Sequence, residues 1–178
     1  MEFTNWLSLQ EANLSGLYAD TVRAFPRTTK RQHAIDEIVV RQMDWTPFKG
    51  VKTLLVKGLA KNEGNGKEYK PLILFKKVNY HDSKQNRNWI EIVASDGRKH
   101  VFEKINNSNE VVVRCDCADF FWRFNYEDSL RKLLYGRVRS KYEAKDNPGS
   151  SNPLELPGMC KHLIKLARSL SDAGVLED

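Results

Sequence analysis

Cysteine, proline and long apolar runs are all scarce in this chain. Its 178 residues include three cysteines and six prolines. No apolar stretch approaches the roughly 20 residues that a membrane-spanning helix needs. The amino terminus lacks a basic region followed by an apolar one, so we expect no secretory signal peptide. These absences argue against a membrane protein and favour synthesis in a reducing cytoplasm.

The composition is that of a folded protein with a modest positive charge. Apolar residues make up 40% and charged residues 29%, and the formal net charge is +6. A chain of this length can bury a core, as one domain or as one domain with an extension. Either of two acid-free basic segments could contact phosphates, dock on an acidic neighbour or face solvent. The first contains Arg23, Arg27, Lys30 and Arg31, and the second contains Arg131, Lys132, Arg137, Arg139 and Lys141.

Two helices are predicted, one near each end of the chain. Ser8 and Glu11 have the spacing of a capping box and open a helix that Pro26 ends, after about Ala24. The closing helix follows residue 160, has apolar residues at helical spacing and ends near Gly174.

The middle of the chain is predicted to be antiparallel β-structure after an extended polar arm at 27–34. The turn pair Asp96-Gly97 between two alternating apolar runs is a strong hairpin signal, and the glycine-rich turn 63–67 predicts another hairpin over 53–80. The last strand of the predicted meander leads directly into Cys115. The predicted strands are 36–43, 53–60, 69–80, 89–95, 99–105 and 110–114. Together with the two helices, they give an α+β fold of antiparallel meander and hairpins.

All three cysteines fall in one pattern with a histidine. One residue separates Cys115 from Cys117. After 42 intervening residues come Cys160 and, two positions further, His162. Three thiolates and one imidazole form a closed tetrahedral set that is typical of structural zinc. A one-residue spacer requires a turn or bulge, because alternate residues of a strand point to opposite faces. Cys160 and His162 can converge in the first turn of a helix. We therefore predict one structural zinc ion held by these four residues.

Other interpretations of the pattern are weaker. A lone buried cysteine is usually a small apolar residue, but here every cysteine belongs to the pattern. A disulfide between Cys115 and Cys117 would be strained, and any pairing leaves an odd thiol. A Cys/His nucleophile would need a third group to orient its base, and none is evident beside Cys160. We therefore predict no catalytic residue. A metalloenzyme would need an open ligand position, which four protein ligands do not leave.

The segment between the ligand pairs, 118–159, is rich in aromatic residues near its start. We predict that Phe120, Trp122 and Phe124 pack beneath the metal. The chain is then divided into an N-terminal helix and basic arm at 1–34, a β-hairpin region at 35–87, and a zinc-binding domain at 88–178 with 118–159 as a long insert.

A strand, Cys-x-Cys at its end, Asp119-Phe120 and then Cys-Lys-His-Leu at the start of a helix resemble the SWIM-type zinc finger. The resemblance covers about residues 88–171 and implies a small ββα unit around one zinc ion that contacts DNA or protein. The insert is longer here than in ordinary members of that family.

A longer resemblance is to SWIM-like virion proteins of tailed bacteriophages. It rests on Arg123, Tyr126, an Asn-Pro pair at Asn147 or Asn152, and Pro157-Gly158, and on the segments 29–34 and 69–75. It implies a non-enzymatic structural or connector component of the virion, made in the host cytoplasm. Its partners would be other proteins of the neck, tail or baseplate, contacted through Arg23, Arg27, Lys30 and Arg31. The alternative is a zinc-dependent DNA-binding accessory protein that contacts nucleic acid through its basic segments.

Overall fold

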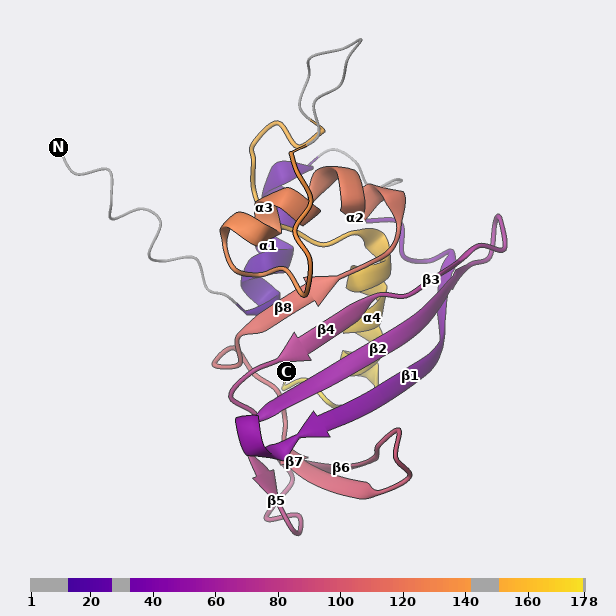
Figure 1. Ribbon diagram of the computed structural model, residues 1–178. Helices are drawn as coiled ribbons and strands as arrows, with labels where there is room; N and C mark the ends of the chain where they lie inside the picture. Colours follow the sequence, from indigo (N-terminus) through magenta and orange to yellow (C-terminus); the bar gives the residue numbers. More distant parts are fainter. Residues whose placement is uncertain (1–12, 27–32, 142–150, 178) are drawn as a thin grey trace, which may run out of the picture.

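The fold consists of two antiparallel sheets and several helices (Figure 1). The computed structural model describes residues 13–26, 33–141 and 151–177. The larger sheet has the order β1-β2-β4-β8, with β3 paired to β2, and the smaller has the order β5-β7-β6. The strands of the larger sheet are β1 Ile38–Phe48, β2 Thr53–Asn62, β3 Glu68–Tyr69, β4 Leu72–Phe75 and β8 Val111–Arg114. Those of the smaller are β5 Tyr80–His81, β6 Trp89–Val93 and β7 Lys99–Glu103. The helices are α1 Leu14–Ala24, the 3₁₀ helix η2 Lys49–Val51, α2 Ala118–Arg123, α3 Asn125–Leu130 and α4 Lys161–Asp172.

Helix α4 packs across one face of the larger sheet. Leu163, Leu166 and Leu170 recur at helical spacing and are fully buried, as are Leu54, Val56, Ile73 and Phe75 of the facing strands. Gly58 of β2 permits this close approach, because a Cβ atom there would lie 3.0 Å from Leu166 Cδ1. Each fully buried leucine side chain contributes about 1.5–3 kcal/mol to stability through the hydrophobic effect. The predicted α+β class and closing helix are thus confirmed.

Both predicted hairpins are present. Strand β2 pairs antiparallel with β4 after the turn that contains Gly66, and β6 pairs antiparallel with β7 around Gly97. Both glycines have positive φ angles, of 69° and 78°, which a residue with a side chain rarely adopts. Strand β1 is longer than predicted and runs to Phe48. Pro47 fits because β1 is an edge strand of this sheet.

The prediction that β8 continues the meander from β7 is wrong. Strand β8 pairs with β4 instead, and Val113 also exchanges backbone hydrogen bonds with residues 133 and 135 on its other side. Val111, Val112 and Val113 are all buried, so both faces of β8 are covered. The predicted domain boundaries after residues 34 and 87 stay a prediction. The paired strands β4 and β8 lie on opposite sides of the second boundary.

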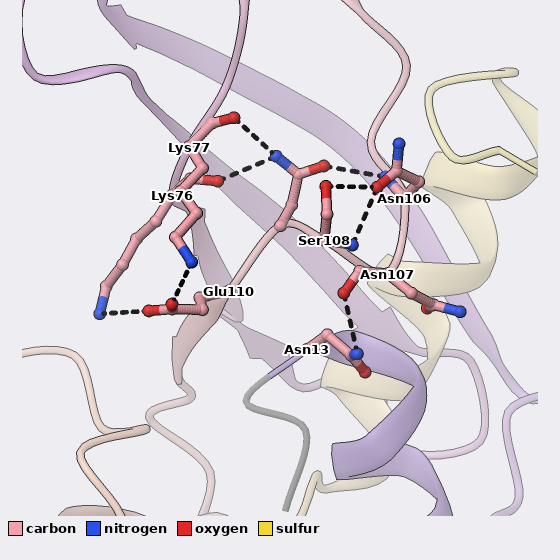
Figure 2. A network of polar contacts seen from close by, with 8 residues as sticks. Asn13, Lys76, Lys77, Asn106, Asn107, Ser108 and Glu110 are labelled. Atoms are coloured by element: carbon pink, nitrogen blue, oxygen red, sulfur yellow. Dashed lines mark hydrogen bonds and ion pairs between the residues drawn. The ribbon is translucent and has the colours of Figure 1, made fainter.

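The turn 106–109, which precedes β8, lies in a network of polar contacts (Figure 2). The Asn109 amide donates to the carbonyls of Lys76 and Lys77, at 2.9 and 3.1 Å, just beyond the end of β4. The Asn107 carbonyl accepts from Asn13 Nδ2 at 3.0 Å, which ties the start of α1 to the same turn. Ion pairs join Glu110 to the same two lysines. These polar contacts therefore hold the turn before β8 beside the end of β4, where the two strands pair.

Helix α1 begins later than predicted. Its N-cap is Asn13, whose side-chain oxygen accepts from Gly16 N at 2.8 Å. Ser8 and Glu11 lie outside the described residues. The helix ends at Ala24, two residues before Pro26, as predicted. Among the described residues, no helix has the length and apolar character needed to cross a membrane.

Candidate metal centre

Four side chains converge where β8, α2 and α4 meet. Cys115, Cys117, Cys160 and His162 each direct one potential ligand atom inward, and these atoms all lie within 4.8 Å of one another. All four residues are buried. The three cysteines are free thiols. The sequence-predicted ligand set is therefore brought together in full.

The Cys-x-Cys pair converges because the chain changes from strand to helix between its two members. Cys115 directly follows β8, whereas Cys117 is the N-cap of α2. The Cys117 sulfur accepts a hydrogen bond from Phe120 N at 3.3 Å, in the way that a serine or aspartate oxygen caps a helix. Asp116 Oδ1 accepts from Lys70 N at 2.8 Å and lies 4.0 Å from Cys115 Sγ, which holds the bend in place.

The second pair lies at the start of α4, as the sequence predicted. Cys160 is the N-cap and His162 lies in the first turn. The preceding residues are held from two directions: Gly158 N donates to Asp128 Oδ1 and Met159 N donates to Thr21 Oγ1, both at 2.8 Å. Gly158 is required here by space, because a Cβ atom would lie 2.5 Å from Phe124 Cε1. Helices α1 and α3 thus determine where Cys160 points.

The imidazole of His162 is oriented by Asn62 at the end of β2. His162 Nε2 lies 2.8 Å from Asn62 Oδ1, and both residues are buried. The amide oxygen only accepts, so Nε2 carries the proton and Nδ1 keeps its lone pair. Nδ1 lies 4.0 Å from Cys115 Sγ, on the side of the thiols. Such a partner on the distal nitrogen is usual for a histidine that binds a metal.

Asn62 and Tyr69 also belong to the site, although no sequence motif predicted them there. The Tyr69 ring packs against the imidazole, with 4.3 Å between centroids. Burial, followed by the nearby Cys117 and Asp116, raises the pKa of the Tyr69 hydroxyl. Both residues belong to the hairpin region, and the β3–β2 pairing places Tyr69 beside Ala60, two residues from Asn62. Only the tertiary arrangement connects them to the ligands.

The thiols differ in how readily they lose a proton. Hydrogen bonds from the Cys115 and Cys160 thiols lower the pKa of Cys117, whereas burial raises the pKa of Cys115 and of Cys160. Because the three thiols are hydrogen-bonded to one another, they titrate as one group. A divalent cation would stabilise the thiolates, so metal binding is coupled to proton release.

The donor set and its size fit zinc. A tetrahedron with metal–sulfur distances of about 2.3 Å has edges of about 3.8 Å, which the observed spacing can accommodate with small shifts. Thiolate and imidazole donors favour zinc over the oxygen-preferring magnesium and calcium. The buried cluster thus suggests a site for one zinc ion. Four protein donors complete a tetrahedron, the arrangement of structural rather than hydrolytic zinc.

Of the three aromatic residues predicted to pack beneath the metal, two are buried and one is exposed. Phe120 and Phe124 are fully buried, and the Phe124 ring also meets Phe25 edge-on at 5.7 Å. Trp122 is 46% exposed instead of packing beneath the site. Residues four apart share one helix face, so the burial of Phe120 and Phe124 turns Trp122 outward.

The predicted partner-binding residues lie largely outside the described part of the chain. Arg27, Lys30 and Arg31 fall within 27–32. Arg23 belongs to helix α1, not to an extended arm, and it forms a half-buried ion pair with the buried Asp20 at 3.4 Å.

No protein-family model, curated protein or solved structure matches the chain. The resemblance to SWIM-type zinc fingers and phage virion proteins therefore depends on the motif residues alone. The geometry supports the broader statement that a buried Cys₃His cluster can bind one metal ion.

Proposed function

We propose that this chain is a non-enzymatic, zinc-stabilised structural protein that connects other proteins in the virion of a tailed phage. The observation that carries the first part is the closed, buried Cys₃His set with an oriented histidine. Such a set leaves zinc no position for a reacting water.

Zinc would join parts of the fold that are distant in sequence. The ligands come from the end of β8, the cap of α2 and the first turn of α4, and Asn62 adds the end of β2. Closing the loop between Cys117 and Cys160 restricts the unfolded chain by on the order of 4 kcal/mol, if the metal acts as a covalent cross-link would. A connector benefits from such rigidity, because a preformed surface loses less entropy on docking.

The virion part of the proposal is supported by the motif resemblance. Its partner surface would be the segment with Arg23, Arg27, Lys30 and Arg31, which meets acidic surfaces of neighbouring subunits. Because these contacts would be between proteins, the isolated chain should bind duplex DNA only in the non-specific range, about 10⁻⁴–10⁻⁶ M at physiological salt.

The test is to purify particles assembled with the wild-type chain or with all four basic residues replaced by alanine. Quantitative mass spectrometry should find the wild-type chain at a fixed copy number and the variant strongly depleted. A matched control replaces the exposed Lys84 and Arg87 by alanine and should be incorporated normally. Absence of the wild-type chain from particles would refute the virion assignment. Equal incorporation of the four-alanine variant would refute this partner surface.

A further inference from the structure

The second basic segment forms an exposed cationic surface after α3. Residues 131–141 contain five basic residues and no acidic one. Arg137, Val138, Arg139, Ser140 and Lys141 are all exposed in succession. In Figure 1 this orange segment runs from beside β8 upward past α2 and α3. We call residues 131–141 the cationic segment.

Hydrogen bonds to backbone atoms hold the cationic segment in place, and the side chains of residues 137–141 stay exposed. Arg114 of β8 donates from Nη1 to the carbonyls of Tyr135 and Arg137, each at 3.0 Å. Asn125 of α3, itself buried, accepts from Arg139 N at 3.1 Å. Contacts from two different elements therefore fix the path of a segment that has no regular structure. A surface ordered in this way loses little entropy when it binds.

Aromatic rings lie beside these cations. The Arg139 guanidinium lies 5.4 Å from the centroid of the Phe121 ring. Phe121 in turn meets Trp122 edge-on, with 4.3 Å between centroids. Trp122 is 46% exposed. An exposed ring and an arginine thus occupy one surface.

The charge of this surface is only partly balanced within the molecule. Lys141 pairs with Glu155, whereas no ion pair joins Arg137 or Arg139 to a carboxylate of the described residues. Arg137 and Arg139 therefore fit a partner with repeated negative charges. Phosphate chains are bound by clusters of lysine and arginine.

We propose that the cationic segment, with Phe121 and Trp122, binds single-stranded nucleic acid. Arg137 and Arg139 contact phosphates, and an unpaired base stacks on the exposed indole of Trp122. A duplex would satisfy the cations equally but hides the faces of its bases, so the exposed aromatic ring favours a single strand. This activity depends neither on a place in a virion nor on the segment 23–31.

The test is fluorescence anisotropy of labelled 20-nucleotide oligothymidylate with the full, zinc-loaded chain over a series of salt concentrations. The double variant R137Q/R139Q should bind more weakly and lower the slope of log K against log salt by about 1.4, because each phosphate contact contributes about 0.7. W122A should bind about tenfold more weakly with an unchanged slope, as expected for losing one stacked base. The control K84Q/R87Q removes the same charge from a distant loop and should leave affinity and slope nearly unchanged.

Three results would overturn the proposal. One is no binding, or binding that both variants leave intact. Another is equal affinity for a duplex together with no effect of W122A, which would mean that only phosphates are contacted. The third combines two observations: polyglutamate displaces the oligonucleotide at equal charge concentration, and W122A also weakens the binding of polyglutamate. Together they would identify an acidic protein as the partner. Zinc content and circular dichroism of each variant establish that it is folded.

Discussion

The sheet beneath α4 and the insert at 118–159 are stabilised in different ways. The sheet and α4 bury mainly apolar side chains such as Leu54, Ile73 and Leu166. The insert adds Phe120 and Phe124 to the same core, but it also buries polar groups, among them Asn125, Asp128 and Asn152. Apolar burial is non-directional, whereas each buried polar group needs a specific partner. We therefore expect the insert to depend more than the sheet does on exact contacts and on the metal that closes it.

The largest expected effect comes from removing a ligand in Cys160→Ser. Metal ligation contributes on the order of 10 kcal/mol in small structural zinc sites, so the region around the insert should lose most of its protection. Hydrogen exchange should accelerate most over residues 115–160 and change least in the 53–80 hairpin and the part of α4 that packs on it. Chelation of zinc from the wild-type chain should give the same pattern, and zinc should reverse it. Uniform protection throughout the variant would contradict the account.

A cavity in the apolar region should have a smaller and different effect. Leu166→Ala removes a fully buried side chain next to Gly58 and should lower the free energy of unfolding by about 2–5 kcal/mol. Chemical denaturation measures this change, and the zinc content should stay near one equivalent. The control is Leu130→Ala, because Leu130 is 60% exposed and should matter little. Loss of zinc from Leu166→Ala would show that the two regions are not separable.

The partner of the histidine tests the connection between the two regions. Asn62→Ala leaves all four ligands but removes the acceptor of the His162 Nε2 proton. Zinc affinity should fall by about 10–100-fold, as is typical for such a partner, while saturating zinc still gives one equivalent. Competition with a chromophoric chelator measures the affinity. Asn65→Ala, in the neighbouring exposed turn, should retain wild-type affinity, and equal affinity for Asn62→Ala would refute the assigned orientation of the ring.

The smallest predicted effect concerns pH. Burial raises the pKa of Asp128 well above 3.8, although Gly158 N donates to its carboxylate. The folded state therefore holds this proton more tightly than the unfolded state does. The resulting stabilisation is complete below pH 3.8 and is lost as the pH rises through the raised value, by about 1.4 kcal/mol for each unit of the shift.

Asp128→Asn removes this dependence, so the variant should gain stability relative to the wild type as the pH rises. Denaturation of both chains across the pH range measures the difference. Acid releases zinc from both chains, so only their difference is informative. The exposed Asp172→Asn serves as the control. A difference for Asp128→Asn that does not change with pH would contradict the raised pKa.

The ligands could be predicted from sequence because their chemistry is local and their spacing is diagnostic. The hairpin around Asp96-Gly97 was equally predictable, since glycine readily adopts the positive φ that its short turn requires. The strand that pairs with β8 could not be predicted, because the pairing depends on contacts between Asn109 and residues 76–77. Asn62 is 100 positions from His162, so no local pattern could connect them. The predicted burial of Trp122 was wrong because it rested on aromatic character alone and ignored the position of the residue on the helix.

The central claim is that one zinc ion is bound by three sulfurs and one imidazole nitrogen. X-ray absorption at the zinc edge of the purified chain, together with its metal content, tests this most directly. The account predicts one equivalent of zinc with three sulfur neighbours at about 2.3 Å and one nitrogen at about 2.0–2.1 Å. A fully folded chain without metal, or a zinc ion with an oxygen neighbour in place of one of these ligands, would contradict it.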